Sequence, residues 1–352
     1  MKGVVLAGGK GSRLRPFTYS GAKQLVPIAN VPVLHFPVNQ LVACGITDIA
    51  LVVGETEPQI RAAMGDGSRF GARFSYIRQE APLGIAHGLG ICRQHASGEP
   101  VVLYLGDNVL LGGISDFVRD FAASRSAASV ILKEVHDPRA FGVGALEDGR
   151  LTRIVEKPAE PETNLAVIGV YAFRADIFDI IDGLTPSARG ELEIADAING
   201  LIGAGLAVDA AVTADYWIDT GKMEDMLEAN GAVLGTFATQ LSPGSTIRDC
   251  TMSGIVTVAD GAVIDGCEIL GPVAIGPGAR LTGSRIGPNV AIGEGCTVSN
   301  SSISNAIIME STSVRDCPGI VDSMIGRFAS VNCAPSNSRL VLGDHSRFEV
   351  GA

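Results

Sequence analysis

The chain has 352 residues, of which 46% are hydrophobic, and it carries a formal net charge of −11. This length is too great for one ordinary core and predicts two domains. The negative charge argues against nucleic acid and anionic membrane surfaces as partners. No apolar run reaches the roughly 18 residues that span a bilayer, and no leader pattern precedes the first apolar run, so we expect a cytoplasmic protein.

The cysteines predict neither a disulfide framework nor a zinc site. There are seven of them, an odd number, and no two form a CxxC pair. We therefore interpret them as small, buried apolar groups.

The first 230 or so residues alternate short apolar runs with longer segments of helical period. Runs of continuously apolar residues are typical of parallel strands that are covered on both faces, and the alternation predicts an open, doubly wound α/β sheet. The predicted strands are GVVLAG (3–8), DIALVVG (48–54), FSYIRQ (74–79), PVVLYLGD (100–107) and ASVILKEV (128–135). Ligands of such sheets bind at the carboxyl ends of the strands.

A bare, cationic loop, LAGGKGSRLRP, follows the first predicted strand. Its glycines would let the backbone approach a ligand, and Arg13 and Lys23 supply charge that suits a triphosphate. The GxGxxG pattern fails at Leu14, and no GK[ST] follows for a P-loop. A solvated loop with ordinary surface arginines is the alternative.

Two aspartates follow apolar stretches, Asp107 in LGDN and Asp219 in YWIDTGK. Two carboxylates and a triphosphate make a magnesium site, whereas either aspartate alone could be a cap or turn residue. Glu156 and Lys157 in VEKP could face one ligand, although such neighbours are common on surfaces. Arg189 in ARGELEI could bind a phosphate, but the segment also resembles a helix start.

From about residue 241 aliphatic residues recur every five or six positions and produce a period of 17. This spacing predicts a triangular parallel β-helix with three short strands in each coil. The recurring positions are Val258, Ile264, Ile269, Ile275, Leu281, Ile286, Ile292, Val298 and Ile303, with corners at Gly276-Pro277, Gly287-Pro288 and Gly293-Glu294. The period weakens after Val314. A Gly-rich β-sandwich would need period-two alternation and hairpin signals instead.

Taken in order, these motifs resemble the sugar-1-phosphate nucleotidylyltransferase family. They are GGKGSRLRP, KQLVP, YIRQEAPLGIAHG, LGDN, FGV, VEKP, TNLAVIGVY, SARGELEI and YWIDTGK. The resemblance covers nearly the whole chain and points to the long members that carry a left-handed β-helix. It implies a Rossmann-like, doubly wound mixed or parallel α/β nucleotidyltransferase domain at residues 1–238 and a left-handed hexapeptide-repeat β-helix at 239–352.

The resemblance also implies a Mg²⁺-dependent reaction. A phosphate oxygen of glucose 1-phosphate attacks the α-phosphorus of dTTP in line, which yields dTDP-glucose and pyrophosphate. A homo-oligomer is expected. The pathway that the product enters, rhamnose or another deoxysugar, stays open.

Residue roles follow from the resemblance, position by position. The catalytic set comprises Arg13, Lys23, Asp107, Lys157 and Asp219, and Asp107 and Asp219 would hold the metal. The nucleotide would contact Leu6, Gly8, Gly9, Gly11, Gln24, Gln79, Pro82 and Gly84. The sugar phosphate would contact Gly142, Glu156, Lys157, Arg189 and Trp217. A glutamine amide at position 79 suits the edge of thymine or uracil better than that of adenine.

The sequence departs from the family's pattern at two positions. Val31 stands where a lysine usually precedes the proline, and Phe141 stands where the short members have tyrosine.

Three other functions compete with this interpretation. The base could be uracil or another base rather than thymine. A non-catalytic paralogue that binds sugar nucleotide would be expected to lack one of Arg13, Lys23, Asp107 and Asp219, and all four are present. An acyltransferase β-helix needs a histidine between its coils, and after His136 the only histidine is His345, beyond the clear repeats.

Overall fold

The computed structural model describes residues 1–147 and 149–350. The chain divides into two compact units, one of residues 1–10 and 34–219 and the other of residues 11–33 and 220–352. Each unit joins segments that lie far apart in the sequence. The division crosses the glycine-rich loop between Lys10 and Gly11.

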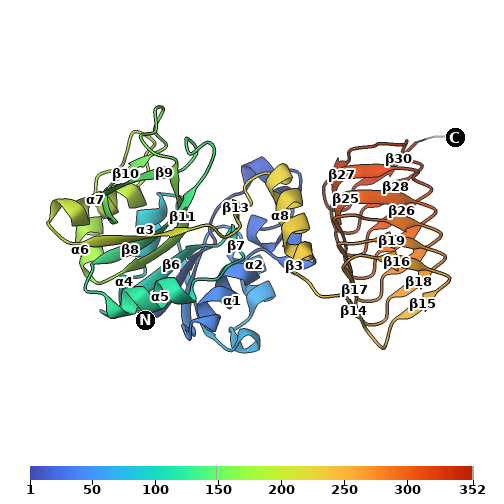
Figure 1. Ribbon diagram of the computed structural model, residues 1–352, viewed down its shortest axis with the longest axis horizontal. Helices are drawn as coiled ribbons and strands as arrows, with labels where there is room; N and C mark the ends of the chain where they lie inside the picture. The colour runs from blue at the N-terminus through green and yellow to red at the C-terminus, as the bar shows by residue number, and fades with distance from the viewer. Residues whose placement is uncertain (148, 351–352) are drawn as a thin grey trace. The chain divides into compact units, whose positions relative to one another are not determined.

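The first unit is built on a nine-stranded sheet (Figure 1). In spatial order its strands are β5 (Arg73–Arg78), β4 (Asp48–Val53), β1 (Lys2–Leu6), β6 (Val101–Leu105), β11 (Leu165–Phe173), β8 (Ala128–Glu134), β12 (Val208–Thr213), β10 (Arg150–Glu156) and β9 (Gly142–Glu147). All five predicted strands are present. β5, β4, β1 and β6 run parallel to one another, whereas β11 runs antiparallel to both β6 and β8. The sheet is therefore mixed, which is one of the two arrangements that the prediction allowed.

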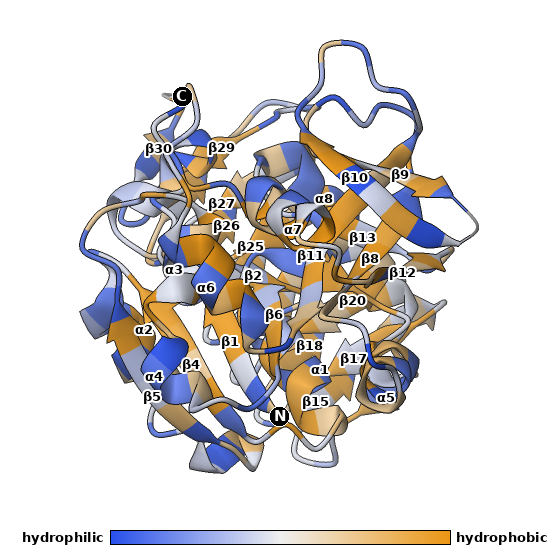
Figure 2. Cartoon of the chain, turned by 90° about the vertical axis from the view of Figure 1, so that its left-hand side faces the viewer, coloured by the Kyte–Doolittle hydropathy of each residue, from blue (hydrophilic) through white to orange (hydrophobic). Residues whose placement is uncertain are grey.

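The central strands are apolar because both of their faces are covered. On β1, Val4 belongs to a core cluster with Ala86 and Leu89, while the next residue, Val5, is equally buried on the opposite face. Figure 2 shows the resulting hydrophobic colouring of β1, β4 and β6. The helices of this unit are α1 (His35–Ala43), α2 (Glu57–Met64), α3 (Ile85–Gly90), α4 (Arg93–Ala96), α5 (Ser115–Ala123), α6 (Asp176–Asp182) and α7 (Ile194–Gly203).

Four parallel strands end at one edge of this sheet. β1 ends at Leu6, β4 at Val53, β5 at Arg78 and β6 at Leu105. The segments that follow these strands contain much of the predicted site, so the parallel pairing brings them to one edge.

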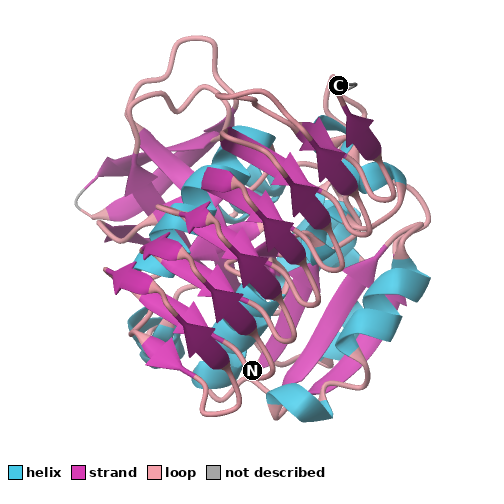
Figure 3. Cartoon of the chain, turned by 90° about the vertical axis from the view of Figure 1, so that its right-hand side faces the viewer, coloured by secondary structure: helices cyan, strands magenta, loops and turns pink. Residues whose placement is uncertain are grey.

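The second unit contains a parallel β-helix whose coils stack strand upon strand (Figure 3). One seven-stranded sheet contains β15 (Thr246–Arg248), β18 (Val263–Asp265), β21 (Arg280–Thr282), β24 (Thr297–Ser299), β26 (Ser313–Arg315), β28 (Ser330–Asn332) and β30 (Arg347–Glu349). Ile264 pairs with Leu281, and Leu281 pairs with Val298. Each step is the predicted 17 residues. Left-handed winding stays a prediction.

The strands on the other two faces of the β-helix form two stacks, and both stacks pair with the single strand β25 (Ser302–Ile308). One row is β14 (Gln240–Leu241), β17 (Val256–Val258), β20 (Val273–Ile275) and β23 (Val290–Ile292), and the other is β16 (Thr251–Ser253), β19 (Glu268–Leu270) and β22 (Arg285–Ile286). β27 (Ile320–Ile325) and β29 (Val341–Leu342) follow β25.

One coil is shorter by a residue, which explains why the sequence period weakens. Val298 pairs with Val314, a step of 16, and the next step, from Val314 to Val331, is again 17. The corner Gly287-Pro288-Asn289 separates β22 from β23, whereas β25 continues through the corresponding corner of the next coil. The period therefore slips once and does not end.

A column of small side chains lies inside the coils at intervals of 16 or 17 residues. The backbone N–H of Ser284 donates to the Sγ of Cys267, and the N–H of Ser301 donates to the Oγ of Ser284. The N–H of Cys317 continues the column by donating to Ser301 Oγ. All seven cysteines are free thiols. The interpretation of the cysteines as buried groups is correct for four of them and wrong for Cys44 and Cys250, which are partly exposed, and for Cys333, which is exposed.

The loop of residues 11–33 and helix α8 (Met223–Gly235) are attached to the β-helix. Asn230 of α8 is fully buried, and its Oδ1 accepts a hydrogen bond of 2.8 Å from the N–H of Ala29. Its Nδ2 donates to the carbonyl of Asn289 over 3.1 Å. Arg327 donates to the carbonyl of Leu25 over 3.0 Å. The loop contains η1 (Ser12–Leu14), η2 (Phe17–Tyr19), η3 (Lys23–Leu25), β2 (Pro27–Ile28) and β3 (Val31–Pro32).

The predicted domain boundary between residues 238 and 239 lies in the segment between α8 and β14. It stays a prediction, because the compact units divide the chain elsewhere. Among the residues that the structure describes, no helix combines the length and apolar character needed to cross a membrane.

Replacing Asn230 with alanine should lower the free energy of unfolding by about 2–4 kcal/mol, because the buried N–H of Ala29 and the partly buried carbonyl of Asn289 lose their partner. Urea unfolding measures the change. Glu228→Ala, at an exposed position of the same helix, is the control and should change stability by about 0.5 kcal/mol or less. Equal effects of the two substitutions would contradict this role for Asn230.

Candidate functional site

The two predicted metal-binding aspartates belong to neighbouring elements of the first unit. Asp107 follows β6 in a turn whose Gly106 N–H donates to the Leu6 carbonyl over 2.9 Å. The next strand, β7 (Asn108–Leu110), pairs antiparallel with β13 (Trp217–Asp219), and Asn108 lies opposite Asp219. The pairing places Asp219 beside the residue that follows Asp107.

A chain of hydrogen bonds runs from Trp217 to Asp107. The indole Nε1 of Trp217 donates to the Oδ1 of Asn108 over 2.7 Å, and the Nδ2 of Asn108 donates to the Oδ1 of Asp107 over 3.0 Å. Asn108 is only 3% exposed, so its two hydrogen bonds matter for its orientation. These two hydrogen bonds fix the position of one carboxylate oxygen of Asp107.

A pocket of about 180 Å³ brings several predicted sugar-phosphate residues together with Asp219. It is smaller than the pockets of roughly 300 Å³ or more that hold drug-sized ligands and so suits a small polar molecule. Its lining residues include Phe141, Gly142, Glu156, Lys157, Tyr171 and Asp219. Phe141 meets Trp217 edge to face, with ring centroids 5.2 Å apart. The ring that replaces the family's tyrosine therefore supports the indole.

Charged groups of both signs surround the carboxylate of Glu156. Burial raises its pKa above the usual range, against the attraction of the nearby cations. Lys157 Nζ lies 3.5 Å and Arg189 Nη2 3.2 Å from Glu156 Oε1. Arg189 also forms an ion pair of 2.7 Å with Glu193, which is buried. The two cations are thus held at the pocket by carboxylates.

Lys157 has an unusual backbone conformation. Its φ is 45°, in the left-handed region that residues other than glycine rarely adopt, and its N–H donates to the Phe141 carbonyl over 3.0 Å. Pro158 follows directly and ends β10. Such local strain persists where the surrounding structure fixes it, often at functional sites.

The predicted base-binding residues meet at the ends of β1, β4 and β5. Gln79 follows β5, and its N–H donates to the Val53 carbonyl over 2.8 Å. A methyl group on Gly8 would lie 3.6 Å from Gln79 Oε1, and one on Gly54 would lie 2.9 Å from the Gly8 carbonyl oxygen. Glycine at these positions lets the two loops come close. Gly9 and Pro82 are exposed in the adjoining loops.

Four predicted residues lie in the second compact unit: Gly11, Arg13, Lys23 and Gln24. Gly11 has a φ of 62°, and a methyl group there would meet Lys23 Cβ at 2.7 Å, so the turn that precedes Arg13 lies against Lys23. Gln24 is 1% exposed, and its Oε1 has no hydrogen-bond partner among the residues described. The convergence of these residues with Asp107 and Asp219 stays a prediction.

Sequence reasoning missed three side chains of the site: Asn108, Tyr171 and His87. Asn108 was visible as the last residue of LGDN, but its buried hydrogen bonds depend on strand pairing. Tyr171 lies in an apolar strand whose sequence carries no signal of a pocket. His87 contacts Gln79 from helix α3, eight residues further along the chain.

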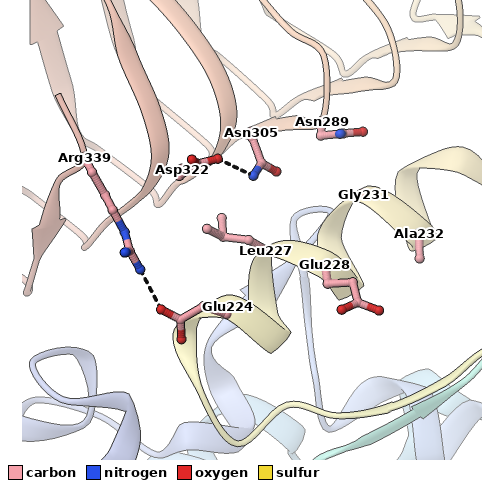
Figure 4. Close-up of a pocket in the computed structure, with 9 residues that line it drawn as sticks. All are labelled: Glu224, Leu227, Glu228, Gly231, Ala232, Asn289, Asn305, Asp322 and Arg339. Carbon is pink, nitrogen blue, oxygen red and sulfur yellow. Dashed lines mark hydrogen bonds and ion pairs between the residues drawn. The ribbon is translucent and has the colours of Figure 1, made fainter. Parts of the chain in front are cut away.

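A larger groove of about 580 Å³ lies between α8 and the β-helix within the second unit (Figure 4). Arg339 pairs there with Glu224, and Asn305 donates to Asp322 over 2.7 Å. The groove contains none of the predicted site residues.

The donor set fits magnesium. Asp107 and Asp219 offer hard carboxylate oxygens, and Mg²⁺ usually binds one or two carboxylates together with substrate phosphates and water. Among the residues described, no group of three or more histidine, cysteine, aspartate or glutamate side chains could hold a metal alone.

A mixed α/β sheet with a glycine-rich loop and Asp107 at the carboxyl edge of its parallel strands is typical of proteins that bind nucleotides at that edge. Comparison with known proteins makes this specific. The chain belongs to the nucleotidyl transferase family, whose model matches residues 2–235.

Some of its relatives match it over nearly the whole length. It is 44% identical, over 356 residues and 100% of both chains, to a glucose-1-phosphate thymidylyltransferase of Streptomyces griseus. It is also 44% identical, over 99% of this chain and 100% of the relative, to the low-salt glycan biosynthesis nucleotidyltransferase Agl11 of Haloferax volcanii. A solved Bacillus anthracis structure, assigned as a glucose-1-phosphate thymidylyltransferase in complex with sucrose, matches 66% of this chain and 94% of its own, with 36% identity and a TM-score of 0.63.

Replacing Trp217 with phenylalanine should lower the kcat of nucleotidyl transfer about tenfold, because Asn108 loses its donor and holds Asp107 less firmly. Steady-state kinetics measures the loss, and thermal unfolding checks the fold. Trp217→His, whose ring N–H can donate, should recover part of the activity. Wild-type kcat in Trp217→Phe would show that the indole N–H has no role in positioning.

Proposed function

We propose that this protein transfers a thymidylyl group from dTTP to glucose 1-phosphate and so produces dTDP-glucose and pyrophosphate. The observation that carries the proposal is the pocket that combines Glu156 and Lys157 with the carboxylate of Asp219. One small cavity thereby offers an acceptor for sugar hydroxyls, a cation for phosphate and a ligand for a metal. The full-length similarity to a thymidylyltransferase supports the same substrates.

The reaction exchanges one phosphate ester for another. A phosphate oxygen of glucose 1-phosphate forms a bond to the α-phosphorus of dTTP as the bond from that phosphorus to the leaving pyrophosphate breaks. The nucleophile is already an anion, so no proton must be removed by a base. Catalysis therefore depends on holding two mutually repelling anions in line and on stabilising charge.

The pocket, together with Arg189, which contacts its lining residue Glu156, is assigned to the sugar phosphate. Lys157 and Arg189 bind its phosphate. The carboxylate of Glu156 accepts hydrogen bonds from glucose hydroxyls, and the backbone of Gly142 forms hydrogen bonds with them. In the free protein Glu156 and Glu193 hold the two cations. An incoming phosphate would compete with these carboxylates. Trp217 contributes through Asn108 and through its contact with Phe141.

Asp107 and Asp219 are assigned to Mg²⁺. When bound, the ion would neutralise charge on the phosphates. Arg13 and Lys23 are assigned to the triphosphate on the strength of their motifs, GGKGSRLRP and KQLVP. Charge-assisted hydrogen bonds from such groups are the strong ones.

Gln79 and Gly84 are assigned to the base, and thymine is the proposed base. UTP is the main alternative, since it differs from dTTP only in lacking the methyl group of the base and in carrying a 2′-hydroxyl. Discrimination by a single methyl group is worth only about 1–3 kcal/mol. The similarity to a nucleotidyltransferase of glycan biosynthesis also allows another nucleotide or sugar.

The deciding experiment measures pyrophosphate release with glucose 1-phosphate, Mg²⁺ and each of dTTP, UTP, CTP, ATP and GTP in turn. The proposal expects the highest kcat/KM with dTTP and product formation that stops when EDTA is added. A higher kcat/KM with UTP would make the protein a uridylyltransferase. No turnover with any nucleotide, despite binding, would favour a regulatory sugar-nucleotide-binding protein.

Replacing Asp107 or Asp219 with asparagine should lower kcat by about 100-fold or more, because charge that stabilises the transition state is lost while volume is kept. Kinetics at saturating Mg²⁺ measures the loss. Asp196→Asn, at an exposed position of α7, is the matched control and should retain wild-type kcat. Near-normal rates in either site variant would remove that residue from the metal role.

A further inference from the structure

We infer that His87 is a positioning residue that fixes the side-chain amide of Gln79, so that this amide presents only its oxygen to the base. The inference rests on the proposed function, because it assigns Gln79 to the nucleotide. It adds a residue that determines which class of base is accepted.

Two acceptors hold the amide nitrogen of Gln79. Its Nε2 lies 3.2 Å from the carbonyl oxygen of Gly84 and 2.9 Å from the Nδ1 of His87. An amide nitrogen carries two hydrogens and can donate both. The two contacts therefore use the whole donor capacity of the side chain.

The Gly84 carbonyl decides which way the amide points. A carbonyl oxygen can only accept, so the nitrogen of Gln79 and not its oxygen must face Gly84. The backbone on either side of Gly84 is itself fixed. The N–H of Leu192 donates to the Leu83 carbonyl over 2.8 Å, and the Leu192 carbonyl accepts from the N–H of Ala86 over 3.1 Å.

The orientation of the amide then sets the tautomer of His87. Because Nε2 of Gln79 also faces Nδ1 of His87, that ring nitrogen must be the acceptor and the ring proton must reside on the histidine Nε2. The two side chains reinforce each other, since a rotated amide would place its oxygen against the Gly84 carbonyl and against an unprotonated ring nitrogen.

The remaining polar atom is the Oε1 of Gln79. A methyl group on Gly8 would lie 3.6 Å from it, so it points towards the glycine loop after β1. It accepts no hydrogen bond from any residue that the structure describes. The side chain thus offers an acceptor, and no donor, to a ligand at this edge of the sheet.

An acceptor that faces the ring nitrogen of the pairing edge selects bases in which that nitrogen carries a hydrogen. Thymine and uracil carry a hydrogen on N3, and guanine carries one on N1. Cytosine and adenine present an unprotonated nitrogen there, which would face Oε1 as a second acceptor. His87 therefore favours the imide pyrimidines over cytosine.

UTP and CTP form a matched pair for the test, because they differ only at N3 and the 4-substituent. In the wild-type enzyme, kcat/KM for UTP should exceed that for CTP by about 100-fold. His87→Leu removes one acceptor and should reduce this ratio about tenfold, because the amide can then rotate. His87→Gln, whose side-chain oxygen can accept from Gln79, should restore most of the preference.

A double-mutant cycle separates positioning from general damage. In a Gln79→Ala background, His87→Leu should no longer change the ratio of kcat/KM for UTP to kcat/KM for CTP. A purely structural role of His87 would still appear there as a loss of stability. A His87→Leu variant that keeps the wild-type ratio overturns the inference. So does an equal change of the ratio in both backgrounds.

The tautomer provides a readout that does not depend on activity. A ¹⁵N–¹H spectrum of the histidine rings should show the His87 proton on Nε2, and a proton on Nδ1 at neutral pH would overturn the inference. If the wild-type enzyme turns over no nucleoside triphosphate at all, the proposed function fails instead. A protein that forms product with dTTP but lacks the His87 effect would refute this inference alone.

Discussion

The antiparallel pairing of β7 with β13 is the constraint on which the candidate site depends. It joins residues 109 positions apart, Asn108 and Trp217, through a hydrogen bond, and it sets Asp219 opposite Asn108. Strand pairing holds these residues in place before any ligand binds. The pocket lined by Glu156 and Lys157 includes the same Asp219, so one short strand connects the proposed metal ligands with the residues proposed to bind the sugar phosphate.

Positive charge is concentrated locally in this acidic protein. The chain has a net charge of −11, yet Lys157 and Arg189 both lie within 3.5 Å of Glu156 Oε1. Each is paired with a carboxylate in the free protein, which limits the repulsion between the two cations. A substrate phosphate would replace the contacts of these cations with carboxylates by contacts with phosphate oxygens. The free energy of binding then depends on how much stronger the phosphate contacts are than the carboxylate contacts.

The β-helix does more than extend the chain. Its compact unit includes the loop of residues 11–33, which is held by the buried Asn230 and by Arg327. The glycine-rich motif therefore begins in one compact unit, with Gly8 and Gly9, and continues in the other, with Gly11 and Arg13. An account of the β-helix as a purely structural appendage would overlook that it forms hydrogen bonds with the segment that includes Lys23 and Gln24.

The sequence alone determined the features that depend on local pattern. Apolar runs predicted the parallel strands, the 17-residue period predicted the coils, and the motifs predicted the family that the comparison then showed. Tertiary structure decided the rest. The shortened coil, the burial of Asn108 and its bond to Trp217, and the orientation of Gln79 by His87 and Gly84 all depend on which segments lie side by side. Periodicity records which face of an element is buried, whereas a hydrogen bond between distant residues depends on distances that exist only after the chain has folded.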